Sequence, residues 1–218
     1  MAPVEITVRG SHTATLPPEQ ATVFANLGAE GPAPQPVFDA VATAAADVTA
    51  SLQSLHHPKK GPVTKFVIDQ VRRGSHRPVN RDGEQLPLVH TAVVSITATF
   101  TDFDDLSAWV SWSAGVPGLA VGYIDWALTD AKRLRVERTT RQKAVRDARR
   151  RAQDYADALD LGPVTVRTIS DPGMGGPPQR KVMMASAVAD SMGGAPDVSL
   201  RPDDVQIEAH VEATFTVR

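Results

Sequence analysis

Several long segments of the chain alternate hydrophobic and polar residues, the pattern of strands with one buried face. Two of them, residues 4–10 and 21–29, flank the turn-forming Leu16-Pro17-Pro18-Glu19 and predict an opening β-hairpin. In residues 63–73 the alternation places Val63, Lys65, Val67, Asp69 and Val71 on one face of a single strand. Further strands are predicted at residues 88–103, 119–128, 164–166 and 204–218.

Apolar residues spaced three and four apart predict helices between these strands. The first runs over residues 37–55, and Pro36 suits its first turn. A short helix should follow Asp104 and Asp105, which are suited to capping, and run to Trp112. The longest should begin after Thr129 or Asp130 and end at Leu159. Its predicted apolar stripe consists of Val145, Ala148, Ala152, Tyr155, Ala156 and Leu159.

Two segments lack periodicity. Residues 74–87 are polar with Gly and Pro and predict an exposed hairpin loop. Residues 171–202 are rich in Gly, Pro, Ser and Met and predict a long mobile loop, with a possible short strand at 181–185.

This order of elements favours an α+β fold with long antiparallel strands and helices packed on one face. The 218 residues suit a single domain, or one that is divided into two subdomains of about residues 1–103 and 104–218. Hydrophobic residues make up 42% of the chain, enough for a packed core. The net charge of −2 gives no overall attraction to nucleic acid, and the lack of cysteine excludes disulfides and thiolate chemistry.

The sequence contains no apolar run long enough to span a membrane. Its first residues have neither the basic nor the apolar region of a signal peptide. We therefore expect a cytoplasmic protein, or a periplasmic or exported one if a leader has been trimmed.

Three segments resemble the SIMPL-domain family. Ile6-Thr7-Val8-Arg9-Gly10 is similar to its opening strand, and Pro17-Pro18-Glu19-Gln20-Ala21 to its following turn. The most specific match is in the long helix, where residues 144–152 and 155–162 resemble the family's Ala-rich helix ending in Gly. The family includes periplasmic immunogenic proteins of Gram-negative bacteria and a eukaryotic adaptor that binds a Pelle-like kinase.

The resemblance implies a SIMPL-like fold, a bacterial source and a protein without established catalytic residues. Some relatives form ring-like assemblies, so the resemblance also suggests a homo-oligomer. Accordingly we assign no catalytic, cofactor-binding or metal-binding residue, and we expect a non-enzymatic assembly or interaction module.

The long helix is strongly basic over residues 132–151. Its cations predict either a solvated face or a surface that follows phosphates, with Arg138, Arg146 and Arg149 as candidate contacts. The intervening acids and the few aromatic residues favour the solvated face, so nucleic-acid binding is expected to be weak.

Other candidate partner contacts are apolar. Trp109 and Trp112 lie three positions apart on one predicted helix, where they should pack on the sheet, and either would be an anchor if exposed. Met183 and Met184 in the predicted loop would supply adaptable contacts. An alternative function is a small hydrolase whose site lies between the sheet and the two long loops.

Overall fold

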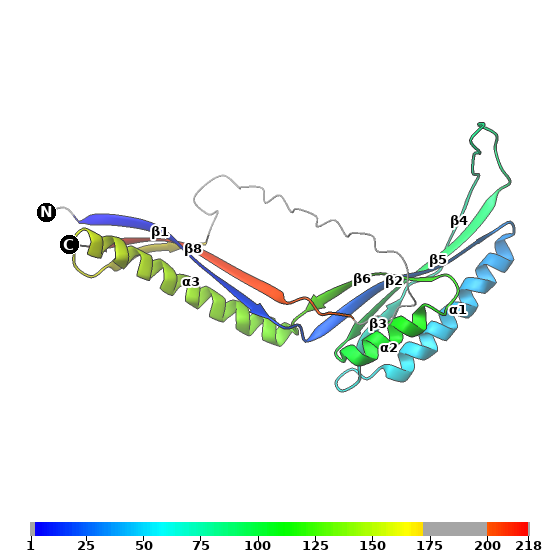
Figure 1. The fold of residues 1–218 in the computed structure, drawn as a ribbon, viewed down its shortest axis with the longest axis horizontal. Coiled ribbons are helices and arrows are strands. Elements are labelled where there is room, and N and C mark those ends of the chain that lie inside the picture. Colours follow the sequence, from blue (N-terminus) through cyan, green and yellow to red (C-terminus); the bar gives the residue numbers. More distant parts are fainter. Residues whose placement is uncertain (1–2, 172–199, 218) are drawn as a thin grey trace. The chain divides into compact units, whose positions relative to one another are not determined.

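The computed structural model describes residues 3–171 and 200–217, and the fold is α+β, as predicted. The chain divides into two compact units, each with its own sheet (Figure 1). The predicted loop is largely residues 172–199, which lie outside the described residues together with the possible strand at 181–185, Met183 and Met184. None of the helices in the described part of the chain is both long and apolar enough to cross a membrane.

The first unit is a three-stranded antiparallel sheet in the order β1-β8-β7 with helix α3 packed on one face. Its elements are β1 (Val4–Leu16), α3 (Asp130–Ala158), β7 (Thr165–Ser170) and β8 (Val205–Val217). The alternation predicted for the last strand is confirmed, because its odd-numbered residues from Val211 to Val217 are buried under the helix.

The second unit is a five-stranded antiparallel sheet with α1 and α2 on one face. Its strands run in the order β3-β5-β2-β6, with β4 also paired to β5. The elements are β2 (Gln20–Gly31), α1 (Pro34–Leu55), β3 (Val63–Ile68), β4 (Arg72–His76), β5 (Val89–Phe100), α2 (Phe103–Ser113) and β6 (Leu119–Ala127). Large side chains such as Phe100, Leu52 and Leu106 fill its core.

The predicted opening hairpin is wrong. β1 pairs along its whole length with β8, from Val4 opposite Val217 to Leu16 opposite Val205. β2 instead pairs with β5 and β6 in the other sheet. Pro17 and Pro18, which have no N–H to give to a strand ladder, stand where the chain leaves one sheet for the other.

The division into units also differs from the expected subdomains on either side of residue 103. Among the described residues, one unit comprises residues 18–127 with 200–203, and the other collects residues 3–17, 128–171 and 204–217. The reason is the pairing of the first strand with the last, which places the two ends of the chain in one sheet.

Three local predictions need correction. The strand expected over 63–73 is interrupted between β3 and β4, and a register shift after Val63 turns Phe66 and Ile68 toward the core, leaving Val67 45% exposed. The cap of α2 is Asp102, whose carboxylate accepts the N–H groups of Asp104 and Asp105.

The third correction concerns the buried stripe of α3. It consists of residues at strict spacings of four: Thr140, Ala144, Ala148, Ala152 and Ala156. Val145, Tyr155 and Leu159, which the sequence placed in the stripe, are 39%, 57% and 62% exposed. Small side chains at this spacing bring the helix backbone close to the sheet.

Gly10 in β1 lies directly beneath this stripe. A Cβ atom at this position would lie 2.1 Å from the carbonyl oxygen of Ala144 and 2.6 Å from the backbone nitrogen of Ala148. The close approach of strand and helix therefore requires glycine here.

The C-terminus of α3 ends in a left-handed residue, Asp160, with φ of 51°. The N–H of Leu161 donates to the carbonyl of Ala156 at 2.9 Å, and that of Asp160 donates to Asp157 at 3.1 Å. These are the two hydrogen bonds of a Schellman motif, which satisfies the last carbonyls of the helix. The Gln153 side chain secures the connection that follows by accepting the N–H of Val164 at 3.0 Å.

Candidate partner-binding groove

An apolar groove of about 910 Å³ opens in the second unit between α1, the end of β2 and the turn that follows α2. We call it the Trp112 groove. It is lined by Leu27, Gly28, Ala29, Asp39, Ala40, Val41, Thr43, Ala44, Asp47, Ala50, Trp112, Gly115, Val116, Pro117 and Gly118.

The groove exists because the side chains between α1 and the turn are small. α1 contributes Ala40, Ala44 and Ala50, and β2 contributes Gly28 and Ala29. No bulky residue of these elements fills the space, so it stays open to solvent. Its apolar floor is Leu27, which is 1% exposed.

One wall of the groove is fixed by a close contact of two glycines. The N–H of Gly28 donates to the carbonyl of Gly118 at 2.9 Å. Gly118 has φ of 79°, and a Cβ atom there would lie 2.1 Å from the carbonyl oxygen of Gly28. This contact holds the turn carrying Val116 and Pro117 against β2.

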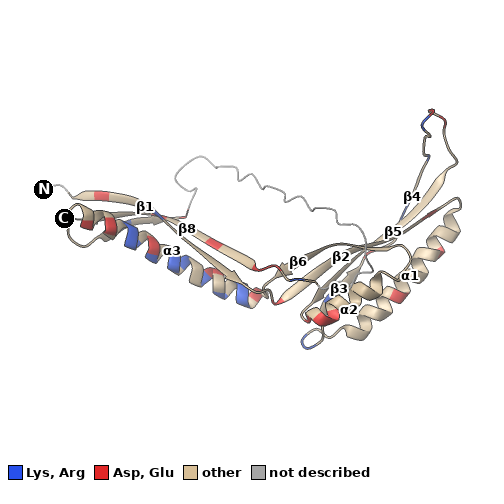
Figure 2. Cartoon of the chain, in the orientation of Figure 1, with Lys and Arg blue, Asp and Glu red and all other residues tan. Residues whose placement is uncertain are grey.

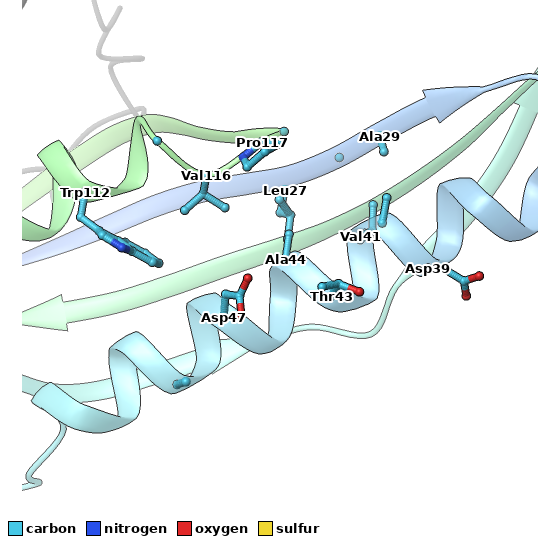
Figure 3. A pocket seen from close by; sticks show the side chains of 15 residues that line it. Leu27, Ala29, Asp39, Val41, Thr43, Ala44, Asp47, Trp112, Val116 and Pro117 are labelled. Atoms are coloured by element: carbon cyan, nitrogen blue, oxygen red, sulfur yellow. The ribbon is translucent and has the colours of Figure 1, made fainter.

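Trp112 forms the end of the groove (Figure 3). Its ring is 41% exposed and lies 6.2 Å from the ring of Trp109, which is only 3% exposed and lies 5.8 Å from Phe100. The three rings lead from the core to the surface, so Trp109 supports Trp112 from below. The indole N–H of Trp109 has no acceptor among the described residues.

The rim of the groove is acidic. Asp39, Thr43 and Asp47 follow one another at spacings of four along α1 and are exposed. Figure 3 shows the carboxylate of Asp47 rising from α1 toward the space between Trp112 and Leu27. Asp39 accepts a hydrogen bond from the amide of Gln35 at 2.8 Å. The groove thus combines an exposed indole with a carboxylate, an arrangement suited to a cation on an apolar stem.

The charges of the helices differ sharply between the units (Figure 2). α1 and α2 together contain four Asp and no Lys or Arg, which gives a formal charge of −4. α3 contains ten Lys or Arg and five Asp or Glu, which gives +5. Arg138, Arg146 and Arg149 are exposed on α3, away from its buried stripe, as the sequence indicated.

Asp147 is the acidic exception on the basic helix. Its carboxylate accepts the N–H of Ser11 in β1 at 3.1 Å and pairs with Arg150 at 2.7 Å and Arg151 at 2.8 Å. Partial burial acts to raise its pKa, but the hydrogen bonds from Ser11 and Arg150 and the two positive charges outweigh this effect. The net result is a lowered pKa. Asp147 therefore ties α3 to the edge of the sheet.

The predicted contact residues are thus distributed over both units. Trp109 and Trp112 belong to one unit and the three arginines to the other, while Met183 and Met184 lie outside the described residues. The pattern at residues 115–118 predicts a turn, but sequence reasoning did not place that turn, Thr43 or Asp47 at a binding site. The sequence did contain a signal for this rim, because Asp39, Thr43 and Asp47 recur at spacings of four on a helix that is otherwise rich in alanine. In the described ranges 3–171 and 200–217, no three His, Asp or Glu side chains are grouped closely enough to hold a metal ion.

Comparison with known families adds one finding. A family model described as SIMPL, a protein of unknown function (DUF541), matches residues 6–215. No curated protein matches the chain.

Proposed function

The chain belongs to the SIMPL family, and on that premise we propose that it is a non-enzymatic assembly module whose copies join through oppositely charged helices. The acidic Trp112 groove of one copy receives the basic outer face of α3 from another. The family description assigns no activity, so the proposal rests on the surfaces of this chain.

The observation that carries the proposal is the charge contrast between the helices of the two units. A formal charge of −4 on α1 and α2 and of +5 on α3 makes each surface repel its own kind and attract the other. Complementary fields of this kind speed association and select the orientation of the partners. Two identical copies meet this requirement without any further protein.

The groove supplies the short-range contacts. An arginine of α3 has an apolar stem that suits Leu27 and Val116, and a guanidinium that suits the Trp112 ring and the Asp47 carboxylate. Tryptophan and arginine are the residues that most often dominate binding energy at interfaces. Exposed Arg138, Arg146 and Arg149 are the candidates for this role.

This contact uses different surfaces on the two partners. Contacts of that type extend from copy to copy and give closed rings or open filaments, whereas a two-fold contact stops at a dimer. We therefore expect species beyond the dimer at high concentration.

Sedimentation velocity over micromolar concentrations and rising salt tests this proposal. We expect association at low salt that weakens as salt screens the charges. Trp112→Ala should shift the association to at least about tenfold higher concentration, because interface tryptophans commonly contribute more than about 1.4 kcal/mol. Tyr123→Ala is the matched control, since Tyr123 is a 61% exposed aromatic residue of the same unit outside the groove.

A 23.3 kDa monomer at every concentration and salt would contradict the proposal. So would equal effects of Trp112→Ala and Tyr123→Ala, because the groove would then have no special role.

A second candidate function is nucleic-acid binding through the same basic face, favoured by the +5 charge of α3. It predicts that an oligonucleotide, and not a second copy, occupies the exposed arginines. Binding to RNA at nanomolar affinity by a chain that stays monomeric would favour this candidate.

A further inference from the structure

A second cleft lies in the first unit, between the N-terminal half of α3 and the last residues of β1. Its volume is about 690 Å³. We call it the β1 cleft. Thr13 and Thr15 line it from the strand, and Lys132, Arg135, Thr139 and Lys143 line it from the helix.

The cleft begins where the close helix–strand contact ends. At Gly10 the strand touches the backbone of Ala144 and Ala148, so no space remains there. Toward its N-terminus the helix carries Val136 and Lys132 in place of alanine, and β1 carries residues with side chains in place of glycine. The two elements therefore separate and leave the cleft.

β1 lies at the edge of its sheet, because among the described residues it pairs only with β8. The N–H of Ser11 points outward, since it donates to Asp147 on the helix. The ladder between β1 and β8 has no register shift, so outward-pointing residues recur at every second position. Thr13 and Thr15 therefore present both their N–H and C=O groups to the cleft.

These edge groups define the chemistry of a ligand. An outward N–H requires an acceptor and an outward C=O requires a donor. A peptide backbone supplies both, whereas a phosphate or carboxylate alone supplies only acceptors. Adding a strand to an exposed sheet edge is a common mode of peptide recognition.

The cations define the charge of that peptide. Lys132, Arg135 and Lys143 extend along about 16 Å of helix axis, at 1.5 Å per residue. Residues 12–16 of β1, at 3.2–3.4 Å each, extend over roughly the same length. Positive charges spaced along the length of the cleft suit several carboxylates on an extended segment better than one compact anion.

We propose that the β1 cleft binds an extended acidic peptide segment, which pairs with β1 at Thr13 and Thr15 and places its carboxylates on Arg135 and Lys143. Asp147 closes one end of this site, because its carboxylate already occupies the N–H of Ser11 and repels an acidic ligand. The site is independent of the Trp112 groove, which belongs to the other unit.

The probe is the peptide Thr-Glu-Val-Glu-Val-Glu-Thr-amide with fluorescein attached to its N-terminal amine, and the control is the same labelled peptide with Gln in place of each Glu. Fluorescence anisotropy should show binding of the Glu peptide, and binding of the Gln peptide at least about tenfold weaker. The double variant Arg135→Gln/Lys143→Gln should lose at least about tenfold in affinity for the Glu peptide.

Backbone pairing is tested separately from charge. Thr13→Pro removes an outward N–H from the cleft, and Thr7→Pro removes one from the same edge outside it; proline is tolerated at such edge positions. We expect Thr13→Pro to abolish binding and Thr7→Pro to retain it. In the unsubstituted protein, the peptide should slow hydrogen exchange at the amides of Thr13 and Thr15 but not of Thr7.

The hydrogen-exchange experiment uses the unsubstituted protein, so it tests backbone pairing of the peptide with β1 even if Thr13→Pro does not fold. Unchanged exchange at both threonines in the presence of saturating peptide would overturn the proposal, as would failure of the Glu peptide to bind. Equal binding of the Gln peptide would remove the role of the cations. Displacement of the peptide by an equal concentration of inorganic tripolyphosphate or of a short oligothymidine would identify a general anion site instead.

Discussion

The two units solve the packing of helices on a sheet in opposite ways. In one unit, α3 packs closely on β1 through alanines spaced by four. Gly10 of β1 faces these alanines and has no side chain to keep the helix away. In the other, α1 and α2 are held off the sheet by large residues such as Leu52, Leu106 and Phe100. The first arrangement leaves no space at Gly10, in the seam between α3 and β1, and the β1 cleft opens only toward the N-terminus of α3. The second leaves the Trp112 groove where the large residues stop and alanines begin. The size of side chains at the contact therefore decides where each unit can receive a partner.

Added volume at Gly10 should have the largest effect on stability. Gly10→Val should destabilise the protein by about 3 kcal/mol or more, because the new atoms meet helix backbone that has no freedom to move away. Urea unfolding followed by circular dichroism measures the loss.

Gly115→Ala is the control for that substitution. The nearest atom to a Cβ at this position is the carbonyl oxygen of Trp112 at 3.4 Å, so the cost should stay below about 1 kcal/mol. Similar losses in the two variants would mean that the seam is not as close as described.

A smaller loss of stability is expected when volume is added to the alanine stripe of α3. Ala148→Leu should cost roughly 1–3 kcal/mol through overpacking against β1. Val145→Leu, on the exposed side of the same helix, should change the free energy of unfolding by less than about 0.5 kcal/mol. Equal unfolding midpoints for the two variants would show that Ala148 is not buried.

Asp147 makes the stability of the seam between α3 and β1 depend on pH. Its pKa is lowered from 3.8 in the folded protein, so its contribution is present above the unfolded pKa and is lost as pH falls through the folded pKa. Asp147→Asn should cost about 1 kcal/mol at pH 7, a modest value because Arg150 and Arg151 are largely exposed.

The stability difference between the Asp147→Asn variant and the unsubstituted protein should therefore shrink as the pH falls below about 4. Denaturant titrations at several pH values measure it. A difference that grows on acidification has the wrong sign and would refute the role given to this carboxylate.

Substitutions on the outer face of α3 should have the smallest effect on the free energy of unfolding. Replacing Arg138, Arg146 and Arg149 by Gln should leave folding nearly intact, because exposed charges contribute only about 0–1 kcal/mol each. Self-association should nevertheless weaken. The unsubstituted chain should bind DNA or RNA only weakly, on the order of 10⁻⁴–10⁻⁶ M at physiological salt.

Local periodicity in the sequence was sufficient to find most elements and the fold class. The alternation that ends at Val217 and the helical spacing of Val37, Val41, Val48 and Leu52 both identify faces that are buried in the structure. Such patterns depend only on near neighbours along the chain.

Pairing between distant segments had no local signal. The partner of β1 lies about 200 positions away along the chain, and nothing near residues 4–16 indicates it. The stripe of α3 was misplaced for a related reason. The larger residues Val145, Tyr155 and Leu159 looked like core, but Gly10 on the opposing strand selects the alanines.

The Trp112 groove was also beyond sequence reasoning, except for Trp112 itself. A groove is a place where side chains are too small to fill the space between elements, and that space is known only once the elements are positioned. Ala40, Ala44 and Gly118 carry no chemical signal of their own.

Oppositely charged helices join copies of this chain in the proposed assembly, and two charge-altered variants, studied alone and mixed, test this contact. One variant, Asp39→Lys/Asp47→Lys, makes the groove basic. The other, Arg138→Glu/Arg146→Glu, adds negative charge to the face of α3. Each variant alone should sediment as a monomer. In the Asp→Lys variant a basic groove repels the basic α3, and in the Arg→Glu variant the acidic groove meets an α3 that has lost most of its positive charge. An equimolar mixture should form heterodimers at low salt, since the unaltered acidic groove of the Arg→Glu variant can receive the unaltered basic α3 of the Asp→Lys variant. Association of either variant alone as strongly as the unsubstituted protein, or a mixture that stays monomeric, would contradict the claim.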